Sequence, residues 1–109
     1  MALLKSKTLR FIPSVDANVV EHRIRIIADG TPFSYDEGYD SVPVQGTALV
    51  NGKIELDIGE LATKPDAEGT YDVYVTAVEN SGNESDPLII ENAAFDFSPP
   101  AAPTAGEIV

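Results

Sequence analysis

The chain has no cysteine, no tryptophan and a single histidine among its 109 residues. Without cysteine it forms no disulfide and has no thiolate for catalysis, and one histidine is too few for the usual zinc ligand sets. Basic residues are also scarce, since 7 Lys and Arg stand against 18 Asp and Glu and give a net charge of -11. A surface this negative repels phosphate groups, so we expect no nucleic acid partner.

Long hydrophobic runs are absent too. No stretch of about 18 apolar residues occurs, and residues 1–7 have neither the apolar length nor the cleavage site of a signal peptide. The sequence therefore predicts no membrane insertion and no signal peptide in this chain, and it leaves the localisation unknown. The hydrophobic content is nevertheless 43%, which is enough for one globular domain with its own core.

Apolar and polar residues alternate with a period of two along residues 9–12, 20–26, 54–58 and 71–77. Such alternation is typical of strands that bury one face, and glycine, proline, asparagine and aspartate separate the segments at short intervals. We therefore predict an all-β fold of antiparallel strands. The predicted core consists of the apolar positions of these segments, namely Leu9, Phe11, Ile24, Ile26, Ile54, Leu56, Tyr71, Val73 and Val75.

Two turns can be assigned from their residues. Asn51 and Gly52 accept positive φ, so they predict a two-residue hairpin between residues 47–50 and 53–58. The polar residues 80–83 predict a second, longer hairpin that leads from the strand around Tyr71 to the apolar segment 88–90.

Two other stretches lack a clear period. Residues 29–46 form the longest irregular segment, with an edge strand expected at residues 42–44, because Pro43 has no N–H for a second partner strand. Residues 98–109 are rich in proline and alanine and are expected to form a flexible tail or linker.

Charge is divided unevenly along the chain. Residues 1–28 carry a net charge of +3, whereas residues 29–109 carry -14. Neighbouring strands of one domain bring such blocks together, so we expect the basic residues of the first block to pair with acids of the second. Each such surface pair adds only roughly a few tenths of a kcal/mol to the free energy of unfolding.

Three stretches share the pattern of one known family: residues 9–14 (LRFIPS), residues 20–26 (VEHRIRI) and, most closely, residues 69–85 (GTYDVYVTAVENSGNES). In this order they resemble a fibronectin type III domain. Phe11 stands where the family has a core tryptophan, and Tyr71 stands at the place of its corner tyrosine. The resemblance implies an immunoglobulin-like β-sandwich of about seven antiparallel strands in two sheets over residues 1–97, with residues 3–7 as the source of a first strand.

The resemblance also implies a class of function. Such domains act as spacers or binding modules, in bacterial or phage proteins among others, and occur in cell-surface, secreted or virion settings. We expect a non-enzymatic module whose partner is another protein or a neighbouring domain of the same parent chain. Residues 98–104 resemble the junction that opens a further repeat in tandem arrays.

Catalysis and cofactors are not expected. His22 shares the core face of its strand with Ile24 and is flanked by Arg23, so it is poorly placed to serve as a general base. A single small sandwich has no second lobe with which to enclose a substrate. We therefore predict no catalytic residue, no cofactor and no metal ligand.

The candidate binding loop lies within residues 29–46. Two tyrosines there flank acidic residues, and tyrosine is enriched in recognition surfaces. Phe33 is expected to anchor this loop in the core, and Tyr74 is expected on the outward face of its strand. The alternative function is a ligand-binding module for carbohydrate or calcium, although the spacing of the acids does not match the helix-loop-helix calcium motif. The candidate binding residues are Tyr35, Asp36, Glu37, Tyr39 and Asp40.

Overall fold

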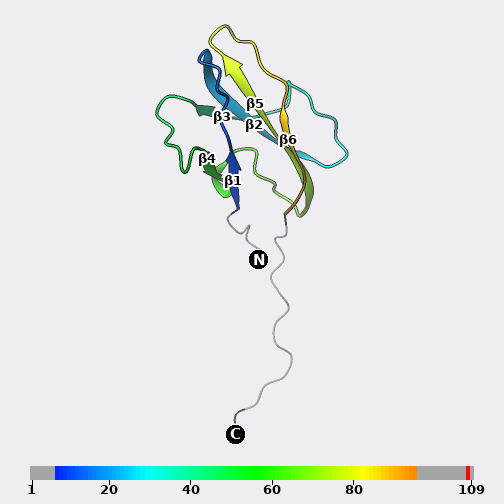
Figure 1. Ribbon diagram of the computed structural model, residues 1–109. Coiled ribbons are helices and arrows are strands. Elements are labelled where there is room, and N and C mark those ends of the chain that lie inside the picture. The colour runs from blue at the N-terminus through cyan, green and yellow to red at the C-terminus, as the bar shows by residue number, and fades with distance from the viewer. Residues whose placement is uncertain (1–6, 96–107, 109) are drawn as a thin grey trace.

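The computed structural model describes residues 7–95 and residue 108, and over this range the fold is all-β (Figure 1). A short 3-10 helix at Ile58–Glu60 is the one helical element of the described residues. No helix in that part of the chain is long and apolar enough to span a membrane. The strands are β1 (Thr8–Phe11), β2 (Val19–Ala28), β3 (Asp40–Pro43), β4 (Ile54–Asp57), β5 (Gly69–Glu79) and β6 (Leu88–Phe95).

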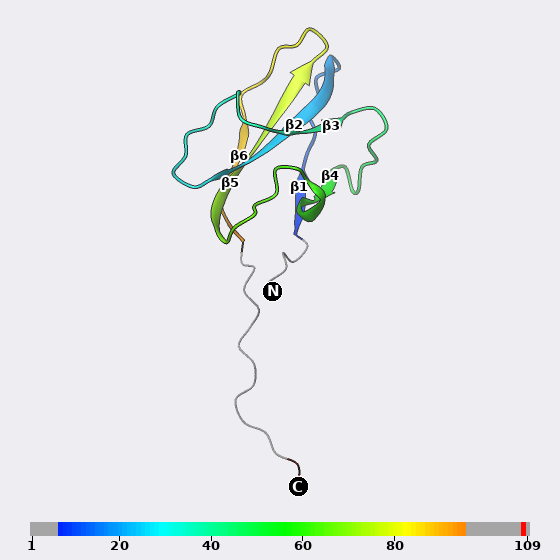
Figure 2. The ribbon, with the colours of Figure 1, turned by 180° about the vertical axis from the view of Figure 1, so that it is seen from behind.

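The strands are antiparallel, as the alternation predicts, and they form two sheets, as the family resemblance implies. One sheet pairs β1 with β4, and the other has the order β3-β2-β5-β6. β2 and β5 are the longest strands and lie together at the centre of the larger sheet, which is visible from both sides (Figures 1 and 2). Six strands are described where about seven were expected, and nearly all of residues 3–7, the expected source of a first strand, lies outside the described residues.

The core lies between the two sheets and contains all nine predicted residues. Six of them are buried, and Ile26, Leu56 and Tyr71 are partly buried against that cluster. Val42 on β3 and Phe95 at the end of β6 extend the core beyond the predicted set. The period-two alternation is therefore a sound guide to the inner faces, because successive side chains of a strand point to opposite sides.

The first predicted hairpin is only partly formed. Asn51 and Gly52 have φ of 52° and 78°, as a two-residue turn requires, and Val50 pairs with Lys53 across it. Residues 47–50, however, do not form the expected strand. The hydroxyl of Thr47 donates to the carbonyl of Pro43, which turns the chain back toward β3 and leaves a single bridge.

The second hairpin and the edge strand are confirmed. β5 and β6 are antiparallel neighbours joined through residues 80–87, and Val78 bridges to Glu84 inside that connection. β3 pairs with β2 alone and so is an edge strand, displaced by about two residues from the expected position. The predicted tail, residues 98–109, lies outside the described residues except for Ile108.

The packing of Phe11 gives a first prediction. Its buried ring meets the ring of His22 edge to face, with 5.3 Å between centroids. Phe11→Ala removes these contacts and leaves a cavity, so it should lower the free energy of unfolding by about 3–5 kcal/mol in urea denaturation. Ile12→Ala is the control, because Ile12 is 70% exposed; it should change stability by less than about 0.5 kcal/mol. Equal effects of the two substitutions would place Phe11 outside the core.

Candidate functional site

Part of the candidate binding loop packs on the outer face of the larger sheet, away from the core. Phe33 lies against Tyr74 of β5, with 4.7 Å between ring centroids, and against Tyr35, at 4.8 Å. Tyr74 does lie on the outward face, but it is buried there. The expectation that Phe33 inserts into the core is wrong, because Phe33 packs against a ring on the opposite side of the sheet.

Arg25 stands at the centre of this outer layer and has 0% exposure. One guanidinium nitrogen, Nη1, donates to Oε2 of Glu84 at 2.6 Å and to the hydroxyl of Thr76 at 3.3 Å. Nη2 donates to the main-chain carbonyl of Tyr35 at 3.0 Å, and Nε donates to that of Glu37 at 3.3 Å. Arg25 on β2 therefore joins the loop to Thr76 of β5 and to Glu84 of the β5–β6 connection.

Three aromatic rings surround the buried guanidinium. Its Cζ lies 5.0 Å from the ring centroid of Tyr39, 5.6 Å from that of Phe33 and 5.9 Å from that of Tyr35. Tyr39 also stacks on the guanidinium of Arg23 at 4.3 Å. The negative face of an aromatic ring attracts a cation, so these rings stabilise the charge of Arg25 where water cannot reach it.

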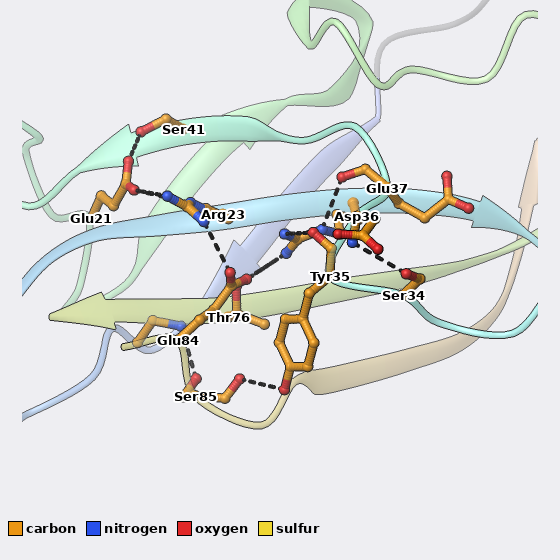
Figure 3. A network of polar contacts seen from close by, with 12 residues as sticks. Glu21, Arg23, Ser34, Tyr35, Asp36, Glu37, Ser41, Thr76, Glu84 and Ser85 are labelled. Atoms are coloured by element: carbon orange, nitrogen blue, oxygen red, sulfur yellow. Dashed lines mark hydrogen bonds and ion pairs between the residues drawn. The ribbon is translucent and has the colours of Figure 1, made fainter. Parts of the chain in front are cut away.

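Glu84 supplies the carboxylate that the buried arginine needs. Its oxygens accept from Arg25, from Nη1 of Arg23 at 2.9 Å, and from the hydroxyl of Thr76 (Figure 3). Burial raises the pKa of Glu84, but the hydrogen bonds from Arg25 and Thr76 and the charges of both arginines outweigh burial. The pKa of Glu84 therefore lies below its ordinary value, and the carboxylate stays ionised.

Three of the five candidate residues, Tyr35, Glu37 and Tyr39, contact Arg25, and Asp36 lies between them in the sequence. The loop uses the main-chain carbonyls of Tyr35 and Glu37 and the ring of Tyr39 in the contacts described above, and the hydroxyl of Tyr35 donates to the carbonyl of Ser85. The main-chain N–H of Asp36 donates to Ser34. The carboxylates of Asp36 and Glu37 belong to exposed residues.

The fifth candidate residue, Asp40, belongs to a different contact. Its carboxylate accepts from the main-chain N–H groups of Ala62 and Thr63 and from the hydroxyl of Thr63, at 2.7–2.9 Å. Asp40 thus fixes the segment after the 3-10 helix to β3. Within the described residues, no three His, Cys, Asp or Glu side chains are grouped so that they could hold a metal ion.

Sequence reasoning missed the residues on which the loop depends, Arg25, Thr76 and Glu84. It did predict that basic residues of the first block pair with later acids, and the Arg10–Glu55 and Arg25–Glu84 pairs confirm this. It treated all such pairs as surface pairs. The sequence did contain one sign that the outer face of β2 is covered. Ile27 breaks the alternation by placing an apolar side chain on that face, where it is buried.

His22 lies where the sequence placed it, on the core face of β2 and buried. Its Nε2 accepts from the main-chain N–H of Ser14 at 3.1 Å, and its Nδ1 is the buried side-chain atom without a hydrogen-bond partner in the described residues. Burial lowers the pKa of His22, because the charged imidazolium loses its hydration there.

Two shallow hollows flank the connection between β5 and β6. The larger, of about 340 Å³, lies between residues 14–19 and that connection and includes the acidic residues Asp16, Glu79 and Glu84. The smaller, of about 210 Å³, reaches from the end of β1 to the start of β6 and is lined by Phe11, Ile12, His22, Ala77 and Leu88 among others.

The buried ion pair gives a second prediction. Glu84→Ala leaves the charge of Arg25 buried without its carboxylate, which should lower the free energy of unfolding by about 3–5 kcal/mol. Glu55→Ala is the matched control, because Glu55 pairs at 2.8 Å with an Arg10 side chain that is mostly exposed. Its loss should cost about 0–1 kcal/mol. Similar losses in chemical denaturation would mean that the Arg25 pair contributes no more than a surface pair.

A third prediction concerns acid. His22 has a folded-state pKa below the ordinary 6.5. As the pH falls, the imidazole is therefore protonated at a higher pH in the unfolded chain than in the folded one. Its contribution to stability is complete above pH 6.5 and is lost as the pH falls through the folded pKa. Glu84 adds a second loss below its ordinary pKa of 4.5, as the pH falls through its own folded pKa. Stability should therefore decline in two steps.

The measurement is chemical denaturation at a series of pH values. His22→Gln keeps a polar group at this position but does not titrate, so it should flatten the slope just below pH 6.5 and leave the slope below pH 4.5. An unchanged slope in both ranges would show that another group causes the acid sensitivity.

Comparison with protein-family models, with curated proteins and with solved structures finds no match for this chain.

Proposed function

We propose that this chain is a non-enzymatic β-sandwich module of the fibronectin type III kind. It serves as a spacer or a protein-interaction domain in a larger assembly, and its partners are neighbouring domains or another protein. The assignment to this kind of sandwich rests on strand pairing and on one tyrosine. The assignment of function rests on how the candidate binding loop is held.

Tyr71 supports the kind of sandwich. It lies near the start of β5, and its hydroxyl donates to the carbonyl of Ala67, four residues upstream, at 2.8 Å. A tyrosine that bonds back to the backbone at the entrance to this strand is a hallmark of immunoglobulin-like sandwiches. The strand orders fit the same arrangement, with β1 and β4 in one antiparallel sheet and β3, β2, β5 and β6 in the other.

The single observation that carries the functional proposal is the buried guanidinium of Arg25. Its hydrogen bonds take up the carbonyls of Tyr35 and Glu37, and three rings enclose it. Many polar and aromatic groups of the candidate binding loop are therefore engaged in contacts that hold the domain together. Such an arrangement favours a rigid module over a site preformed around a ligand.

A ligand-binding module is the second candidate, and one observation favours it. The rings of Tyr35 and Tyr39 remain about half exposed beside the carboxylates of Asp36 and Glu37. Aromatic rings next to polar groups suit carbohydrate, and carboxylates suit calcium. Each ligand would have to bind to the exposed side of this loop.

The test, a fourth prediction, is titration with calcium and with a glycan panel. Calcium at a few millimolar should raise the melting temperature no more than sodium or magnesium at matched ionic strength, because relief of charge repulsion depends on ionic strength alone. Amide chemical shifts in residues 29–46 should stay small and unsaturated, and the glycans should give no binding.

A saturable shift confined to that loop would replace the spacer function with the ligand-binding one. Asp36→Asn should then abolish the shift, whereas Asp66→Asn, an exposed acid on another segment, should leave it. The matched control separates a specific site from the general acidity of the chain.

A further inference from the structure

The connection between β3 and β4 contains the asparagine–glycine turn of the partly formed hairpin. The connection projects from the side of the fold in both views (Figures 1 and 2). Asn51, Gly52 and the following Lys53 are all exposed. Water and hydroxide ions therefore reach every atom of the turn.

The main-chain nitrogen of Gly52 is not engaged in holding the turn. The N–H of Val50 donates to the carbonyl of Lys53 at 2.8 Å, and the N–H of Lys53 donates to the carbonyl of Val50 at 3.0 Å. The N–H of Gly52 donates to no group within the described residues, and the carboxamide of Asn51 makes no hydrogen bond there either. Two neighbouring groups that can react with each other are thus both free of competing bonds.

The space around Gly52 is also open. Glycine has no Cβ to crowd the approach of its nitrogen to the preceding side chain. Gly52 has a φ of 78°, and a Cβ built on it would meet nothing within 4 Å. Bringing this nitrogen to Cγ of Asn51 needs rotation about two bonds of Asn51 only, and a turn held by one isolated bridge allows such local motion.

We propose that Asn51 is a site of spontaneous deamidation in the folded protein. Hydroxide removes the proton of the Gly52 N–H, and the nitrogen then attacks Cγ of Asn51 and forms a new C–N bond. The bond between Cγ and the side-chain nitrogen breaks, and that nitrogen takes up a proton and leaves as ammonia. The product is a cyclic succinimide between residues 51 and 52, formed without oxidation or reduction.

Water then opens the succinimide in one of two ways. Cleavage between the Gly52 nitrogen and Cγ gives aspartate. Cleavage between that nitrogen and the main-chain carbonyl carbon of residue 51 gives isoaspartate, in which the main chain runs through Cβ and Cγ. Over both steps one water is consumed and one ammonia is released, and either product adds one negative charge to the -11 of the chain.

Isoaspartate has the larger structural effect of the two products. It adds one methylene group to the main chain inside a two-residue turn, which then no longer keeps Val50 opposite Lys53. The buried Ile54 follows directly as the first residue of β4, and core packing holds it in place. The modification therefore alters the β3–β4 connection of an aged molecule while the two sheets stay folded.

The other four asparagines are less suited to this reaction. Asn18, Asn80, Asn83 and Asn92 are each followed by a residue with a Cβ, which crowds the attacking nitrogen. Asn92 in addition lies within β6, and the carboxamide of Asn83 donates to Glu79 at 3.0 Å. Asn80 is exposed and has neither of these restraints, so it is the best comparison within the chain.

The experiment is incubation of the full folded chain at neutral and at mildly alkaline pH, followed by isoelectric focusing and peptide mapping. A species with one additional negative charge should accumulate in proportion to hydroxide concentration, and the change should map to residue 51. The chain unfolded in urea is the reference and should convert at a comparable rate. A folded chain that keeps its charge while the unfolded chain converts would overturn the proposal, because the turn would then protect Asn51.

Three variants identify the reacting groups. Asn51→Asp carries the charge of the product from the start, so the acidic shift should be lost. Gly52→Ala adds a Cβ beside the nitrogen and should slow the shift severalfold. Because alanine is strained at this positive φ, the rate is measured in urea as well, where the strain is absent and the slowing should persist.

Asn80→Asp is the matched control, and the shift at residue 51 should continue in it at the wild-type rate. A shift that survives in Asn51→Asp, or that disappears in Asn80→Asp, would assign the acidic species to another residue and overturn the proposal. A Gly52→Ala chain that converts as fast as wild type in urea would exclude attack by this nitrogen.

The modification is independent of the proposed module function. A chain that keeps Asn51 unmodified can still serve as a spacer or a protein-interaction domain. A saturable shift in residues 29–46 on titration contradicts the module function, whatever the charge at residue 51.

Discussion

A single buried positive charge sets the conditions for much of this structure. Arg25 is fully buried from water. A guanidinium left there without a partner would lower the free energy of unfolding by roughly several kcal/mol. The fold meets this requirement with the carboxylate of Glu84, two loop carbonyls and three rings. Because these groups come from separated parts of the chain, the loop, β2 and the β5–β6 connection have to be in place together.

The two faces of the larger sheet are therefore stabilised by different kinds of interaction. The inner face contributes apolar side chains such as Ile24 and Val73 to a core that water does not enter. The outer face carries a layer of charge and aromatic rings, in which hydrogen-bond geometry decides what fits. β2 and β5 are buried on both sides where these layers overlap, which makes them the best-protected strands of the described fold.

The sequence was sufficient for the inner layer and insufficient for the outer one. Alternation identifies Leu9, Ile54 and Val75 correctly, because burial on an inner face depends on local period alone. The same alternation assigns Arg25 and Tyr74 to a solvent face, and they are buried only because a distant loop folds over them. That contact depends on the path that the loop takes over the sheet. The alternation of residue types within a strand carries no information about this path.

The candidate loop and its flanks show the same division. The sequence correctly predicted an irregular segment ending in an edge strand, since glycine and proline restrict backbone choice locally. It grouped Asp40 with the loop residues, although Asp40 instead caps the segment at Ala62 and Thr63. It also expected a strand at residues 47–50, where the side-chain bond of Thr47 to Pro43 competes with strand pairing.

The manner in which Arg25 holds the loop has a consequence for sequence change. The guanidinium binds the carbonyl oxygens of residues 35 and 37, which every amino acid possesses, while the side chains of Asp36 and Glu37 face outward. Residues at these two positions can therefore be exchanged without altering the path of the backbone. The domain is in this respect a ready scaffold for grafting short peptide epitopes or for building a library of binders.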